Sequence, residues 1–203
     1  FSEFADAIGA PVDKGALFTM LFKKALEGDA DCGGLLSYNY FSGEGVTDLD
    51  EGRPLFVRMP DSAFTLANFM RAHIYSALAA VKLGMDILLK EEHVRVDRLL
   101  GHGGLFTVKG VAQRYLAAAV NTPVTVMDTA SEGGPWGMAL LAAYLLDGKE
   151  KALETYLDED IFSGLKGSTV SPDVADVEGY ERFIRNYTAA LPVEKAAIEH
   201  MNW

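Results

Sequence analysis

Two glycine-rich turns hold the residues of this chain whose types and spacing could bind a ligand. The first is GHGG at 101–104, which follows an apolar segment and leads into a helical pattern over about 107–120. The second is EGGPWG at 132–137, which follows the apolar segment 124–128 and opens another helical pattern. Glycine lets the backbone pass close to a ligand, and the first amides of a helix offer free donors to phosphate or ribose oxygens. Strand, glycine turn and helix, repeated at once, is typical of α/β proteins that bind nucleotides.

The first turn taken alone has more than one interpretation. In a Rossmann-type site, Asp128 at the end of the next strand would bind a ribose of NAD or S-adenosylmethionine. Against this, the turn lacks the third glycine of G-x-G-x-x-G, and the 27 residues from Gly101 to Asp128 are slightly long for that motif. An isolated GxGG is also a common tight connection between a strand and a helix.

Several catalytic patterns are absent from the sequence. It contains neither the GxxxxGK[ST] phosphate loop nor the GxSxG elbow of serine hydrolases. No histidine lies at metal-ligand spacing from another histidine, a cysteine or an acid. We therefore expect no catalytic residue and no metal ligand in this chain. The four histidines are His73, His93, His102 and His200.

The composition limits the partners of the protein. Its 203 residues are 49% apolar, enough for one large domain, and no segment has the uninterrupted apolar length of a membrane helix. With 18 Lys and Arg against 29 Asp and Glu, the net charge of −11 disfavours nucleic acid and anionic membranes as partners. The single cysteine, Cys32, cannot form an internal disulfide, so we expect a cytoplasmic protein with Cys32 as a small packed residue.

Hydrophobic periodicity predicts the elements that position the two turns. The longest helix should span 65–90 and pack on a sheet, with His73 as a hydrogen-bonded packing residue. The last helix, about 177–191, places aromatic residues on one side, which indicates a docking face. The other expected elements are two helices within 1–27 that break at 9–11, strands at 35–41, 54–59, 94–100 and 124–128, a helix at 149–157, and a loop at 164–174.

The order of these segments resembles the C-terminal domain of the FGGY carbohydrate kinases, which belong to the actin-like ATPase superfamily. The stretch LLSYNYFSGE at 35–44 is similar to the family's apolar strand that ends in tyrosine and x-Ser-Gly-Glu. GHGG at 101–104 is similar to its adenosine-binding turn, with Gln113 in the helix where the family often has glutamine. EGGPWGMALLAA at 132–143 resembles its final E-G-x-x-x-G-x-A-x-x-A helix. The likeness covers about residues 1–150 and is closest to the xylulose- or ribulose-kinase branch.

The resemblance implies an α/β fold of the actin-like ATPase (ribonuclease H-like) type, with a mixed sheet flanked by helices. It implies that residues 1–203 form a single C-terminal nucleotide-binding domain, and that the N-terminal sugar-binding domain with the catalytic aspartate is absent from this chain. The parent protein would transfer the γ-phosphate of ATP, with Mg²⁺ bound through the nucleotide, to a ketopentose such as xylulose or ribulose. The 203 residues alone should be inactive.

The resemblance also assigns a site for ATP or ADP. The glycine turns should line the nucleotide, the backbone near Phe106 should approach the adenine, and Thr107 should offer its hydroxyl. Gly137 should serve helix packing, and a surface left uncovered should favour a homodimer. A non-catalytic actin-like nucleotide-binding or interaction module and a Rossmann-type NAD or S-adenosylmethionine binder remain the alternatives. The candidate cofactor-binding residues are Gly101, His102, Gly103, Gly104, Phe106, Thr107, Gly133 and Gly134.

Overall fold

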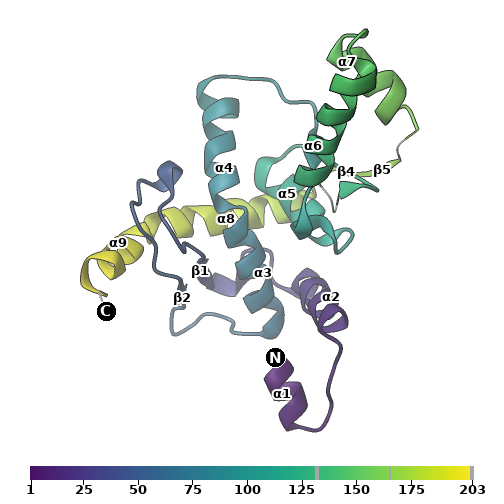
Figure 1. Ribbon diagram of the computed structural model, residues 1–203. Helices are drawn as coiled ribbons and strands as arrows, with labels where there is room; N and C mark the ends of the chain where they lie inside the picture. The colour runs from purple at the N-terminus through teal and green to yellow at the C-terminus, as the bar shows by residue number, and fades with distance from the viewer. Residues whose placement is uncertain (131–132, 165, 202–203) are drawn as a thin grey trace.

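The computed structural model describes residues 1–130, 133–164 and 166–201 as a helix-rich α/β fold with a mixed sheet (Figure 1). β3 and β4 are parallel, β4 and β5 are antiparallel, and β1 pairs with β2 in a separate antiparallel hairpin. The strands are β1 (Leu36–Tyr38), β2 (Leu55–Val57), β3 (Leu99–Gly101), β4 (Val124–Met127) and β5 (Gly167–Val170). The helices are α1 (Ser2–Ala7), α2 (Lys14–Lys24), α3 (Leu66–Ala77), α4 (Ala79–Asp86), α5 (Val111–Val120), α6 (Gly133–Ala143), α7 (Leu153–Tyr156), α8 (Val174–Ala189) and α9 (Leu191–His200).

Buried tyrosines join α3, α5 and α8 into the core. The Tyr75 ring of α3 lies 5.1 Å from the Tyr115 ring of α5 and 4.5 Å from the Tyr180 ring of α8. Buried tyrosine needs a partner for its hydroxyl, and here Tyr115 donates to Ala25 O at 2.7 Å and Tyr180 donates to Tyr75 O at 2.9 Å. The aromatic side of α8 is therefore a docking face, and it packs against α3 of the same chain.

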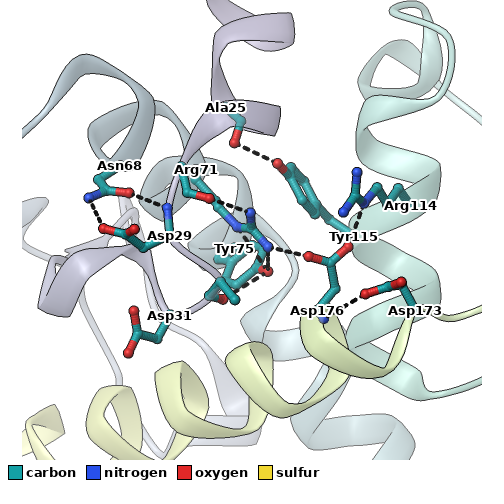
Figure 2. A network of polar contacts seen from close by, with 12 residues as sticks. Ala25, Asp29, Asp31, Asn68, Arg71, Tyr75, Arg114, Tyr115, Asp173 and Asp176 are labelled. Carbon is teal, nitrogen blue, oxygen red and sulfur yellow. Dashed lines mark hydrogen bonds and ion pairs between the residues drawn. The ribbon is translucent and has the colours of Figure 1, made fainter.

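An ion-pair network around the buried carboxylate of Asp176 joins α3, α5 and α8 (Figure 2). Arg71 on α3 donates to Asp176 Oδ1 on α8 at 2.6 Å and to Gly28 O at 2.8 Å, and Arg114 on α5 pairs with the other oxygen of Asp176. Burial alone raises the pKa of Asp176, but its hydrogen bonds to Arg114 and Arg71 outweigh burial, so the pKa lies below its ordinary value. Because α5 begins beside the first glycine turn, this network also positions the turn.

Two expectations about packed side chains are confirmed. His73 Nδ1 lies 3.0 Å from Ser37 Oγ, and its ring packs edge-on against Phe69, while burial lowers the pKa of the imidazole. Cys32 is fully buried, and this burial raises the pKa of its thiol. Cys32 therefore presents no reactive thiol at the surface, and the half-buried His73 serves packing.

The single helix expected over 65–90 is wrong, because the chain bends by 45° between α3 and α4. At the bend, the backbone N–H of Leu78 donates to Tyr75 O. The carbonyl oxygen of Leu78 accepts from the backbone N–H of Lys82, and this bond begins the first turn of α4. Burial continues through the bend at Leu78, Ala79 and Lys82, whereas the apolar side chains of Val81 and Leu88 are 45% and 43% exposed. Within the described residues no single helix is long and apolar enough to cross a membrane, and α3 joined to the segment Ala79–Glu91 meets that test only as a bent pair.

The loop expected over 164–174 is also wrong, because it contains β5. The sequence of β5 is GSTV, which is too short and polar for a strand pattern. Residues of β4 and α5 fix the register of β5. The hydroxyls of Thr169 and Thr125 lie 2.7 Å apart across the two strands, and Gln113 of α5 donates to Ser168 O at 2.7 Å. The helix expected from 107 starts at Val111 instead, after a 3₁₀ turn at Gly104–Phe106.

Candidate functional site

The two glycine turns lie side by side beyond the carboxyl ends of the parallel strands β3 and β4. The N–H of Gly103 donates to Ala130 O at 2.6 Å, which ties the first turn to the segment that follows β4. A Cβ on Gly133 would lie 3.1 Å from the Cβ of His102, so the first residue of α6 touches the first turn. The rings of His102 and Trp136 are stacked, with centroids 6.5 Å apart. In α/β sheets this edge is where ligands bind.

Three glycines at this junction leave their backbone open. A Cβ at Gly103, Gly104 or Gly134 would meet no atom within 4 Å, so a ligand can approach the chain there. Gly103 has φ +101° and ψ 177°, a conformation that side chains rarely adopt. This open backbone next to the first residues of α6 fits the phosphates or ribose of a nucleotide.

The surroundings of two other glycines bear on packing. A Cβ on Gly101 would lie 2.8 Å from the Phe106 ring, so glycine at this position allows that ring to pack against the backbone. The packing role expected for Gly137 is wrong, because a Cβ there would meet nothing within 4 Å and no described residue of α6 is buried. Glu132 of the second turn lies outside the described residues.

A cavity of about 380 Å³ opens beside the first turn, between the start of α5, the end of β4 and β5. Its size is in the range of small-molecule sites. Phe106 and Thr107 line it, as does Val126 of β4, and the hydroxyl of Thr107 donates to Gly104 O at 2.8 Å to close the turn. Of the expected site residues, these two lie in the cavity and the glycines lie at the adjacent junction.

The three charged residues of this cavity were not found by the glycine motifs. Lys109 follows Thr107 closely in sequence, and Lys166 precedes β5. Asp128 ends the β4 segment and was singled out only for the Rossmann alternative. Lys109 Nζ lies 3.9 Å from Asp128 Oδ1, and both side chains are exposed. No pattern in the sequence indicated Lys166, because its place in the cavity depends on the pairing of β5 with β4.

The side chain of Gln113 holds two strands together at the wall of the cavity. Its Nε2 donates to both Val124 O at 2.9 Å and Ser168 O at 2.7 Å, so both of its amide hydrogens are already used. Gly110 at the start of α5 offers no side chain to the first amides of that helix. Among residues 1–130, 133–164 and 166–201, no group of three or more His, Cys, Asp or Glu is arranged to hold a metal ion.

Residues 2–146 match the sequence profile of the FGGY family of carbohydrate kinases, C-terminal domain. The chain belongs to this family. The match includes both glycine turns and every element from α1 to α6, which confirms the resemblance drawn from the motifs. It also favours the kinase interpretation of the first turn over the Rossmann-type one. No curated protein sequence matches the chain significantly.

Solved FGGY kinase structures share the fold. The xylulose kinase from Rhodospirillum rubrum is 22% identical with a TM-score of 0.67, and the alignment covers 91% of this chain and 35% of that one. The ligand-bound xylulose kinase from Lactobacillus acidophilus is 17% identical with a TM-score of 0.66, covering 89% and 34%. Plasmodium falciparum glycerol kinase with ADP is 15% identical with a TM-score of 0.65, covering 90% and 34%. This FGGY chain thus spans about a third of the length of these structures.

Proposed function

We propose that residues 1–203 form a single domain, the ATP-binding C-terminal domain of a sugar kinase. The nucleoside occupies the cavity beside Thr107, and the phosphates run along the open glycines at the junction of the two turns. The observation that carries this proposal is the contact between His102 and Gly133, because it places both family motifs at one edge of the sheet. The ADP-bound glycerol kinase with the same fold supports the choice of an adenine nucleotide.

The parent protein phosphorylates a ketopentose such as xylulose or ribulose in this proposal, which the xylulose kinase neighbours support. Phosphoryl transfer requires a base on the sugar hydroxyl and in-line positioning of both substrates. Mg²⁺, bound through the phosphates of ATP, supplies the neutralisation of their charge. This chain contributes the nucleoside pocket, and the sugar is bound by another domain of the parent protein. We place the protein in the cytoplasm, in keeping with its single buried cysteine.

The 203-residue chain is expected to show no sugar-kinase activity. Phosphoryl transfer requires a base on the sugar hydroxyl and a bound sugar, and in our proposal both come from another domain of the parent protein. The measurement is ADP release from Mg-ATP with xylulose and with ribulose as acceptors. ADP release that depends on either sugar would contradict this division of the reaction between domains.

The chain is also expected to self-associate through α6. Figure 1 shows α6 leading to α7, which projects away from α3 and α8, and α6 and its extension expose Met138, Leu145 and Leu146 at 69%, 66% and 77%. Large exposed apolar surface favours association. Light scattering should show dimers whose fraction rises with concentration, and Leu146→Lys should shift them to monomers. A clean monomer at high concentration for the unaltered chain would contradict this expectation.

A further inference from the structure

Asp128 is the one acidic side chain that lines the cavity among the described residues, and the proposed function gives it no role. It directly follows β4, at the edge of the sheet where the two glycine turns meet. Its backbone N–H donates to Lys166 O at 3.0 Å, so the segment that enters β5 fixes its position. Its place therefore follows from the sheet and does not depend on a free loop.

The segment that positions Asp128 lies outside the stretch that matches the family, which ends at residue 146. β5 approaches β4 closely: a Cβ on Gly167 would lie 2.8 Å from Met127 Sδ and 3.1 Å from Val126 O, so a larger residue there would displace the Met127 side chain. The hydroxyl pair of Thr125 and Thr169 fixes the same register from the other end. Residues 166–168 thus build one wall of the cavity, and Lys166 holds the backbone of Asp128 beside it.

The carboxylate of Asp128 has unused hydrogen-bonding capacity. An ionised carboxylate accepts several hydrogen bonds and donates none. Its nearest cation among the described residues, Lys109 Nζ, is 3.9 Å away, beyond hydrogen-bond distance, and the Asp128 side chain is 65% exposed. A ligand in the cavity that carries N–H or O–H donors would satisfy these oxygens.

We propose that Asp128 is a specificity-determining residue that accepts a hydrogen bond from the nucleoside in the cavity. The inference rests on the proposed function, which puts a nucleoside there. An adenine nucleoside offers two kinds of donor, the exocyclic amino group and the ribose hydroxyls. Both match a lone carboxylate, whereas the carbonyl oxygen that replaces the amino group in hypoxanthine would be repelled by it.

The test is calorimetric titration of the full chain and of Asp128→Asn with the magnesium complexes of three nucleotides. ATP carries both kinds of donor, ITP lacks the exocyclic amino group, and 2′,3′-dideoxy-ATP lacks both ribose hydroxyls. Asp128→Asn should weaken ATP binding roughly ten- to hundredfold, the range of a hydrogen bond to a charged group. The control Asp48→Asn makes the same charge change at a side chain that is 99% exposed and pairs with Lys195, and it should leave all three affinities unchanged.

The pattern across the three nucleotides decides the proposal. If Asp128 accepts from the amino group, Asp128→Asn weakens ATP and dideoxy-ATP but not ITP. If it accepts from the ribose, the variant weakens ATP and ITP but not dideoxy-ATP. Equal affinities for the variant and the unaltered chain, or an equal loss with all three nucleotides, would overturn the inference while leaving the proposed function intact. No binding of any nucleotide to the unaltered chain would overturn both.

Discussion

Arg71→Ala is expected to lower the free energy of unfolding by about 3–5 kcal/mol, the usual cost of removing one partner from a buried ion pair. The side chains of Arg71 and Asp176 are only 3% and 4% exposed, so water cannot replace the lost guanidinium. The change would also leave Gly28 O without its donor from Arg71 and remove the cation that lies 4.8 Å from the Tyr115 ring centroid. Urea denaturation monitored by circular dichroism measures the effect.

The stability prediction for Arg71→Ala can be checked against a surface variant and against pH. Arg95→Ala removes an exposed pair with Asp97 and should change the free energy of unfolding by about 0.5 kcal/mol or less. The effect of Arg71→Ala should shrink in acid, because the stability from a lowered carboxyl pKa is full above the ordinary value of 3.8 and is lost as the pH falls through the lowered pKa of Asp176. A loss for Arg71→Ala no larger than that for Arg95→Ala would contradict the structural role of the network.

Gly104→Val is expected to weaken Mg-ATP binding by more than about tenfold, with a loss of folding stability of roughly 1 kcal/mol or less. The valine side chain would project into space that is open in the fold and that the nucleotide occupies in our proposal. Gly103→Val is a poorer test, because φ +101° at that position makes any side chain costly to the fold itself. The measurement is calorimetric titration of the unaltered and substituted chains with Mg-ATP.

A matched variant separates blocked binding from a general effect of valine. Gly84 lies in α4, and a Cβ there also meets nothing within 4 Å, so Gly84→Val adds the same side chain away from the turns. It should bind Mg-ATP as the unaltered chain does. If Gly104→Val also binds with unchanged affinity, the nucleotide does not lie over the first turn.

The sequence predicted those parts of the fold that depend on local patterns. Apolar runs bounded by glycine and proline gave β1, β2 and β4, and the break at 9–11 separated α1 from α2. The glycine turns could be recognised because few residue types allow such backbone. Their contact with each other follows from the parallel pairing of β3 and β4, whose carboxyl ends lie at the same edge of the sheet.

Other parts depend on partners that are distant in sequence. β5 is polar and short, and it forms because Gln113 and Thr125 supply hydrogen bonds across 55 and 44 residues. Its absence from the sequence prediction concealed one wall of the cavity, including Lys166. Similarly, Arg71 and Asp176 are 105 residues apart, and no local pattern distinguishes this buried pair from surface charges. The packing of the Phe106 ring against Gly101 was not predicted either, because it depends on how the chain folds after the turn.

The central claim is that the junction of the two glycine turns and the cavity beside it form an adenine-nucleotide site. The most direct test is calorimetric titration of the 203-residue chain with Mg-ATP, Mg-ADP, NAD and S-adenosylmethionine. We expect ATP and ADP to bind, even at millimolar affinity, and we expect Gly104→Val to remove this binding and Gly84→Val to retain it. Selective binding of NAD or S-adenosylmethionine, or adenine-nucleotide binding that Gly104→Val leaves intact, would contradict it.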